Sequence, residues 1–176
     1  MEEIRALELV RICQDFDFVL DFHNTHCPNN DCGFVGCKNW QNSLKLASFF
    51  GISKVIVADY DCINKFVPNY LSVEISLSSD QNDVDFWLER MLSLTQFDPN
   101  QNLQLPELFQ FSRRVSRIEQ NKFRFQNWQA FKIISKLDKT VLDLDSKTNF
   151  YPIFVDDDFT EDYNFAGLIT NFVKRN

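Results

Sequence analysis

The sequence predicts an α/β fold with a mainly parallel sheet flanked by helices, a truncated α/β domain followed by a small β-rich C-terminal domain. Three observations support this prediction. In the first part of the chain, apolar runs of strand length alternate with amphipathic helical stretches, which is typical of βαβ units. The stretch 96–106 then interrupts the alternation with two prolines and several amides. After it come short strand-like runs, mostly with period-two alternation.

The first elements are a helix, a strand and a polar loop. Residues 3–14 predict a helix, because Leu7 and Val10 recur near one face. The run FDFVLDF at 16–22 predicts a buried strand, since it is apolar and rich in aromatic residues. From residue 23 to residue 36 the composition turns to Asn, Pro, Asp and Gly, which predicts a loop.

The next elements repeat this alternation. Apolar residues at helical spacing predict a helix over 40–50, and Gly51 is the natural residue to end it. Two further strands are predicted at 52–59 and 70–76. Another helix follows, and its expected apolar stripe consists of Val84, Trp87, Leu88, Met91 and Leu94.

The change of pattern near residue 98 predicts two domains. We assign residues 1–98 to the α/β domain and residues 99–176 to the β-rich domain. The strand-like runs of this second part are LFQFSRRVSRI, FRFQN, FKIISKL, TVLDL and YPIFV. The end of the chain predicts a terminal helix, because four apolar residues recur on one helical face: Phe165, Leu168, Ile169 and Phe172.

Composition and charge exclude several functions. The 176 residues carry 18 Lys+Arg against 25 Asp+Glu, and the net charge of -7 argues against a nucleic-acid partner. No apolar run is long enough to span a bilayer, and the acidic N-terminal stretch is not a secretory signal, so we expect a cytoplasmic protein with no membrane partner. With only four glycines and no GxxxxGK[ST], the common nucleotide-binding loops are excluded.

Cysteines and histidines cluster after the first predicted strand. Cys27, Cys32 and Cys37 have C-x4-C-x4-C spacing and follow His23 and His26 closely. Zinc favours sulfur and nitrogen ligands, but structural sites usually pair them at shorter spacing. Two interpretations therefore stay open: a structural zinc knuckle, and reduced thiols that merely lie near a functional loop.

Two polar residues lie where a parallel sheet would bind a ligand. His23 follows the first strand, and Glu74 lies within the third, between apolar neighbours. A partly buried glutamate has a raised pKa and can act as a general acid or base near neutral pH. Alternatively, Glu74 is a solvated strand residue and His23 a hydrogen-bonded loop residue. Periodicity and spacing alone indicate only an α/β domain with a polar loop at a strand end.

The string DFHNTHC at 21–27 resembles the D-[LF]-H-N-T segment of the aspartoacylase and succinylglutamate desuccinylase family, zinc-dependent amidohydrolases with a carboxypeptidase-like fold. YLSVEISLSSDQNDVDFWLERM, from residue 70 on, is similar to the strand that carries the catalytic glutamate of that family and to the helix after it. NFYPIFVDDDFTEDYNF, near the end of the chain, is similar to the Y-P-[VI]-F-V segment of the C-terminal β domain of the family.

The resemblance implies a zinc-dependent deacylase of N-acyl amino acids such as N-acetylaspartate or N-succinylglutamate. By the match to the motif, His23 would bind the zinc ion. Glu74 would activate the zinc-bound water and pass its proton to the leaving amine. Asn24 and Thr25 would line the same pocket, and Tyr163 would select the acidic substrate from the C-terminal domain.

The sequence also departs from the family pattern. The first two zinc ligands of the family lie in a G-x-H-G-x-E motif, and its substrate-binding arginines lie in N-D-x-N-R. Only 20 residues precede Asp21, and they contain neither motif. The first strands of the family's sheet would then be missing, and a homo- or hetero-oligomer could cover the exposed sheet edge. Whether the chain is an enzyme therefore stays open among three possibilities: a hydrolase by itself, a non-catalytic relative that binds a ligand or partner, and one half of a split enzyme.

Overall fold

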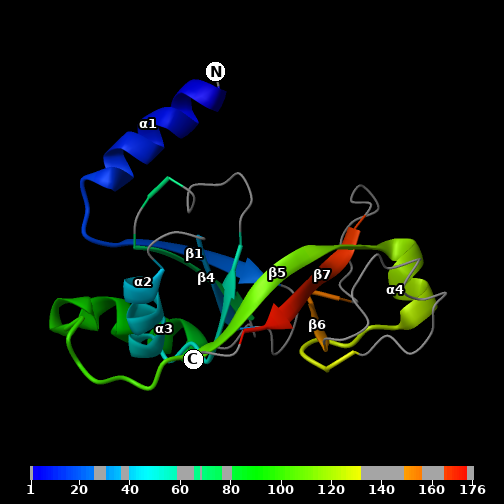
Figure 1. Cartoon of the computed structure of the whole chain (residues 1–176). Coiled ribbons are helices and arrows are strands. Elements are labelled where there is room, and N and C mark those ends of the chain that lie inside the picture. Colours follow the sequence, from blue (N-terminus) through cyan, green and yellow to red (C-terminus); the bar gives the residue numbers. More distant parts are fainter. Residues whose placement is uncertain are drawn as a thin grey trace. The chain divides into compact units, whose positions relative to one another are not determined.

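The computed structural model divides the chain into two compact units (Figure 1), Met1–Glu107 and Leu108–Asn176. We call them the first unit and the second unit. The residues that the structure describes are 2–25, 31–36, 40–58, 66–67, 69–76, 81–131, 149–155 and 165–173.

The strands of the first unit follow the order β1-β4-β2-β3, which is part of a seven-stranded order. Its strands are β1 (Val19–Thr25), β2 (Cys32–Val35), β3 (Lys54–Val57) and β4 (Tyr70–Ser76). β1 runs parallel to β4, and β2 runs parallel to β3, but β2 runs antiparallel to β4. The sheet is therefore mixed, which corrects the expectation of a mainly parallel one.

The source of this difference is β2, which the sequence predicted as part of a polar loop. All four residues of β2 are buried. The strand has only four residues, and the polar residues on either side of it make the whole segment resemble a loop in the sequence. Because β2 lies between β4 and β3, its direction changes the whole sheet from parallel to mixed. The strands predicted at 16–22, 52–59 and 70–76 are present, the last with the predicted bounds.

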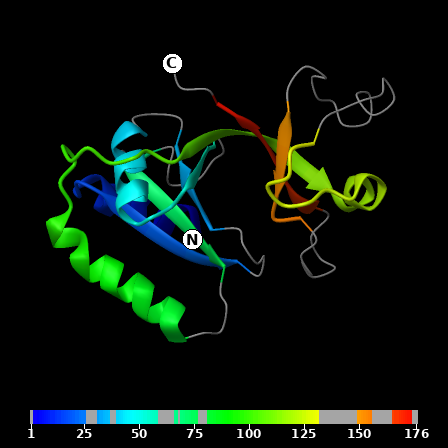
Figure 2. The same cartoon turned by 90° about the horizontal axis from the view of Figure 1, so that it is seen from below.

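Two helices cover one face of this sheet, α2 (Gln41–Phe49) and α3 (Gln81–Leu92), which Figure 2 shows from below. Phe22 of β1 lies 5.8 Å from Phe50 and 6.0 Å from Trp87 between ring centroids. These three rings join β1, the end of α2 and α3 into one aromatic cluster. The rest of the stripe predicted on α3 is largely exposed, with Val84, Leu88 and Met91 open to solvent.

Gly51 ends α2 as predicted. Its φ of 76° lies in the left-handed region, and its N–H donates to the carbonyl of Ser48. A short 3-10 helix, Ser93–Gln96, follows α3.

Helix α1 (Glu2–Gln14) lies on the other side of the sheet, and Figure 1 shows it projecting away from the strands. It contributes Cys13 and Val10 to a small cluster with Val67, Tyr70 and Val19. Because side chains alternate along a strand, Val19 points to the face opposite Phe22. Leu7, which was predicted on the packing face of this helix, is 56% exposed. The helix is therefore held near its C-terminal end.

The second unit contains three antiparallel strands in the order β5-β7-β6. They are β5 (Glu107–Ser116), β6 (Phe150–Ile153) and β7 (Phe165–Phe172), and a helix, α4 (Arg117–Phe123), follows β5. The buried core is formed by Val115, Phe125, Phe150, Val155 and Ile169.

The prediction of a terminal helix was wrong, because residues 165–172 form strand β7. Local spacing favoured a helix, but β7 pairs with both β5 and β6, and these long-range hydrogen bonds outweigh a weak local preference. Gly167, Ile169 and Thr170 are poor helix formers, which agrees with the outcome. The strand predicted from FRFQN is absent. Phe131, the first residue of FKIISKL, forms an isolated antiparallel bridge with Phe150, and the rest of that run and TVLDL lie in 132–148, outside the described residues.

In the part of the chain that the structure describes, no helix is both long and apolar enough to cross a membrane.

Candidate functional site

The two residues predicted to carry chemistry are direct neighbours across the sheet. β1 and β4 pair in parallel, and the register sets His23 opposite Glu74. The same register pairs Asp21 with Ser72 and Val19 with Tyr70. Because side chains alternate along each strand, these residues share one face of the sheet, the face on which α1 packs. His23 lies within β1 rather than after the first strand, which corrects that expectation, and Glu74 lies within its strand, β4, as predicted.

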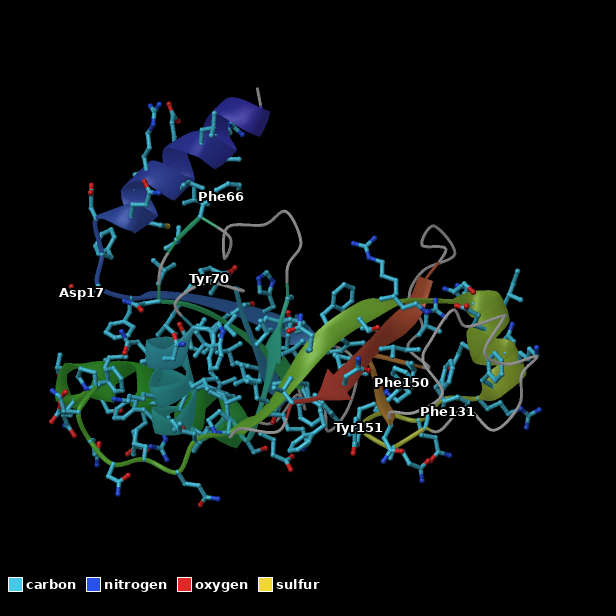
Figure 3. The ribbon with its side chains drawn as sticks, viewed as in Figure 1. Asp17, Phe66, Tyr70, Phe131, Phe150 and Tyr151 are labelled. Atoms are coloured by element: carbon cyan, nitrogen blue, oxygen red, sulfur yellow. The ribbon has the colours of Figure 1, made fainter. Side chains whose placement is uncertain are left out.

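His23 is held by a neighbouring carboxylate. Its Nε2 lies 2.9 Å from Oδ2 of Asp21, two residues earlier on the same strand face. The hydroxyl of Tyr70 donates a hydrogen bond to the same Oδ2 at 2.5 Å. Tyr70 is only 5% exposed, whereas the side chains of Asp21 and His23 are 40% and 52% exposed. Tyr70 lies at the sheet, and Phe66 lies near α1 (Figure 3). The buried phenol of Tyr70 therefore contacts the half-exposed carboxylate of Asp21, which in turn contacts the more exposed imidazole of His23.

Glu74 has a perturbed acidity. Burial raises its pKa above the ordinary value of 4.5; the charge of His23 opposes this rise, and the negative charge of Asp21 adds to it. A carboxyl group with a raised pKa holds its proton at higher pH than an exposed one. Glu74 can therefore exchange a proton at a higher pH than an exposed glutamate can.

Strand β2 borders the site on the other side of β4. Cys32 lies opposite Glu74 in the antiparallel register and is fully buried. Oδ1 of Asp31, just before β2, accepts a hydrogen bond from the backbone N–H of Ser76 at 2.6 Å. This bond connects the start of β2 to the end of β4. Because β4 pairs with β1 on one side and with β2 on the other, Glu74 has a strand on each side.

The predicted cysteine cluster is only partly described. Cys32 belongs to a buried strand rather than to a loop, which corrects that part of the expectation. Cys27, Cys37 and His26 lie outside the described residues. A zinc knuckle built from them stays a prediction.

The described residues do not fit the zinc ion that the resemblance implies. Catalytic zinc sites usually use about three protein ligands. Within the described ranges, no group of three or more His, Cys, Asp or Glu side chains is placed to hold a metal ion. The imidazole of His23 already uses Nε2 in its contact with Asp21.

The remaining predicted residues are less well defined. Asn24 and Thr25 end β1, where the register pairs them with Ile75 and Ser76. Tyr163 lies outside the described residues.

Sequence reasoning missed Asp21 and Tyr70 as parts of the site. The D-x-H spacing was a usable signal for Asp21, because residues two apart on a strand share a face. For Tyr70 there was no such signal, since its place beside Asp21 depends on the register between two strands that are far apart in sequence.

Solved structures of deacylases have a similar fold. The chain is similar to succinylglutamate desuccinylase from Chromobacterium violaceum, with a TM-score of 0.65 and 13% identity over 99% of this chain and 62% of that protein. For the enzyme of the same name from Vibrio parahaemolyticus, the TM-score is 0.61 and the identity 12%, over 97% of this chain and 59% of that one. For an E177A mutant of murine aminoacylase 3, the TM-score is 0.63 and the identity 15%, over 96% of this chain and 68% of that one.

These similarities concern the fold. The chain spans about three fifths of the length of the two desuccinylases, 62% and 59%. The sequence matches no protein-family model, and no curated protein is measurably similar to it. The fold resemblance predicted from DFHNT and the two other segments is confirmed by these structures.

Proposed function

We propose that this chain carries the proton-transfer residues of a deacylase for N-acyl amino acids, with Glu74 as general base and then general acid. One observation carries the proposal: the β1–β4 register places His23 beside Glu74, and burial raises the pKa of the Glu74 carboxyl. Deacylases are among the solved proteins that share this fold, which supports the same reaction class.

The chemistry follows from the two protonation states of Glu74. As a carboxylate, Glu74 takes a proton from the water molecule that attacks the acyl carbon. As a carboxylic acid, it returns that proton to the amide nitrogen, the C–N bond breaks, and a carboxylic acid and an amine are released. Between the two steps the carboxyl must retain the proton, and the raised pKa favours this.

The proposed substrates are acidic N-acyl amino acids, N-succinylglutamate and N-acetylaspartate among them. The first agrees with the names of the desuccinylases that share the fold. We propose that Asn24 and Thr25 contact the substrate, because they continue the strand of His23 toward its carboxyl end. Tyr163 is the proposed contact from the C-terminal part of the chain.

Zinc dependence follows from the resemblance of DFHNT to the family motif. His23 would be one zinc ligand, and the others would have to come from residues that the structure does not describe or from another chain. β1 lies at one end of the strand order in the first unit, so its outer edge is the place where an oligomer would add a strand. The oligomer stays a prediction.

A second candidate function is ligand binding without turnover. It is favoured because, among the described side chains, no group of three metal-ligating residues is placed to hold a metal ion. In that case the face around His23 and Glu74 would bind an N-acyl amino acid but would not cleave it.

One experiment separates the two functions. Purified protein is mixed with N-succinylglutamate or N-acetylaspartate, with and without added zinc, and the products and bound ligand are followed by NMR. Release of the free amino acid by the wild type and by Glu89→Gln, but not by Glu74→Gln, would support the deacylase. Glu89 is a suitable control because it is an exposed glutamate on α3.

Saturable binding without release of product would support the second candidate instead. If the protein neither binds nor cleaves these compounds, both candidate functions are contradicted. Zinc content of the wild type and of His23→Ala, measured on the same samples, would show whether His23 holds a metal ion.

A further inference from the structure

We propose that β1 (Val19–Thr25) pairs with β1 of a second copy of this chain, antiparallel and with Phe22 opposite Phe22. A two-fold axis at this point joins two first units into one continuous sheet. The pairing does not depend on the proposed function, because it concerns the outer edge of the sheet and can be measured without any substrate.

The outer edge of β1 is long and lacks the usual protections. Among the described strands, β4 is the only neighbour of β1. The seven residues of β1 include no proline or lysine, and its register with β4 is continuous. Natural sheets commonly interrupt or shorten their edges, because an open edge pairs with other strands. β6, the strand at the other end of the order, is protected in this way: it has four residues and contains Pro152.

The backbone groups at this edge fit a second copy of β1. The N–H of Val19 donates to the carbonyl of Asn69, 3.3 Å away, and so points toward β4. Because the backbone groups of successive residues point to alternate sides of a strand, those of Leu20, Phe22 and Asn24 point outward. With Phe22 at the centre, Leu20 faces Asn24 of the second copy, and Phe22 faces its own equivalent. Each of these pairs exchanges both hydrogen bonds.

Overlap and charge favour the centre at Phe22 over its neighbours. β1 runs from Val19 to Thr25, so this centre alone pairs every residue of the strand. A centre at Asp21 would oppose two carboxylates, and like charges directly opposite each other destabilise a sheet. The centre at Phe22 instead sets Asp21 opposite His23 of the second copy, twice by symmetry. It also sets the two Phe22 rings beside each other, and cross-strand aromatic pairs stabilise sheets.

Helix α3 extends this surface on one side of the sheet. Trp87 packs against Phe22, with 6.0 Å between ring centroids, so α3 lies against β1. Arg90 donates to the carbonyl of Phe49 at the end of α2, and α2 contacts β4, so this bond marks the inner side of α3. The other side of Trp87 carries an exposed apolar stripe at helical spacing: Val84, Leu88 and Met91. The stripe therefore borders the open edge of β1.

Helix α1 extends the surface on the other side of the sheet (Figure 1). Nε2 of Gln14 donates to the carbonyl of Phe66, in the segment that leads to β4. Leu9 and Ile12 lie on the opposite side of the helix from Gln14, and both are more than half exposed. A two-fold axis perpendicular to the sheet keeps each helix on its own face, so that α1 meets α1 and α3 meets α3. The dimer thus removes apolar surface from water on both faces, which strand pairing alone does not do.

The first test is the mass of the purified chain in solution, measured by sedimentation over a concentration series. We expect a shift from monomer to dimer as the concentration rises. Leu88→Glu places a charge beside the same charge of the second copy and should raise the dissociation constant at least about tenfold. Ile118→Glu is the matched control, since Ile118 is 80% exposed on α4 in the second unit, and it should leave the dissociation constant unchanged.

The second test is disulfide cross-linking, which reports the register. In the proposed pairing, Asp21 and His23 of the second copy form a pair without backbone hydrogen bonds, with Cα atoms about 4.5 Å apart, a distance that a disulfide spans. Under mild oxidation, a mixture of Asp21→Cys and His23→Cys proteins should form a covalent dimer with one chain of each kind. Neither variant should do so alone. Peptide mapping identifies the joined residues and so distinguishes this bond from any that involve the five native cysteines.

Three results would overturn the proposal. The first is a monomer at every concentration, which would leave the edge of β1 open or covered by a different protein. The second is a dimer that Leu88→Glu does not weaken, although circular dichroism shows the variant to be folded. The third is cross-linking of Asp21→Cys or His23→Cys with itself and not in the mixed pair. The expected dimer without deacylase activity would reject the proposed function and leave the β1 interface intact.

Discussion

Substitution of Gly33 by alanine tests the unexpected strand of the sheet. Gly33 lies in β2, opposite Val73 of β4 and Val55 of β3. A Cβ atom at this position would lie 2.9 Å from Cδ1 of Leu71 and 3.3 Å from Cγ2 of Val55. Both side chains are fully buried, so they have little room to move away. Strand β2 therefore packs closely against its neighbours at Gly33, where there is no room for a larger residue.

The expected cost follows from this overlap. Extra atoms in a packed core cost about 1–3 kcal/mol. Replacing glycine by alanine also reduces the entropy of the unfolded chain, which returns about 0.4–1 kcal/mol. We therefore expect Gly33→Ala to lower the free energy of unfolding by about 1–2 kcal/mol.

Urea unfolding measures this change. With a slope of about 1–3 kcal/mol per molar urea, the midpoint should fall by roughly 0.3–2 M. Leu71→Val shortens the side chain that the new Cβ meets, so the double variant should be more stable than the sum of the two single changes predicts. Gly51→Ala is the control. A Cβ atom at Gly51 would have no neighbouring heavy atom within 4 Å, so the loss of stability in Gly51→Ala comes from the φ of 76° alone. Leu71→Val should therefore not reduce that loss.

An unchanged or raised midpoint for Gly33→Ala would refute the reasoning. It would mean that β2 is not packed between β4 and β3, and the enclosure of Glu74 by strands on both sides would be lost with it.

Three further predictions concern two carboxyl groups with shifted pKa values, those of Glu74 and Glu119. Because burial raises the pKa of Glu74 in the folded state, its ionisation destabilises the fold as pH rises above 4.5. Glu74→Gln should therefore unfold at higher temperature than the wild type at pH 7, and the difference should disappear when the pH is lowered to about 4. Glu119 is the opposite case: burial alone would raise its pKa, but hydrogen bonds from Arg113 and Ser116 lower it below 4.5. Ser116→Ala breaks the capping box at the start of α4 and should cost about 1 kcal/mol at pH 7 in thermal unfolding. The stabilisation by Glu119 should be complete above pH 4.5 and lost as the pH falls through its lowered pKa, so a Glu119→Gln variant with unchanged pH dependence would contradict this account.

Much of the first unit could be predicted from local sequence. The helix at 40–50 has an apolar face and a glycine after it, and strand 70–76 is a compact apolar run. These signals are contained within each element. His23 and Glu74 were found because a short motif and a strand carboxylate are also local.

The errors arose where distant contacts decide the structure. β2 is only four residues long, and its strand character comes from β4 and β3 on either side of it. The segment 165–172 has apolar residues at helical spacing, but pairing with β5 and β6 makes it a strand. Tyr70 joins the site through the β1–β4 register, which no local pattern encodes. Long-range pairing outweighs local propensity in β2 and in β7, and the place of Tyr70 beside Asp21 is set by the strand register.

The most direct test of the central claim is the rate of deacylation by the wild type and by Glu74→Gln. The account predicts that the purified chain, with zinc supplied, releases glutamate from N-succinylglutamate or aspartate from N-acetylaspartate. It predicts that Glu74→Gln lowers kcat by about 10²–10⁴-fold with little change in KM, because the glutamine cannot carry the proton. Equal rates for the two proteins, or no turnover by the wild type, would contradict it.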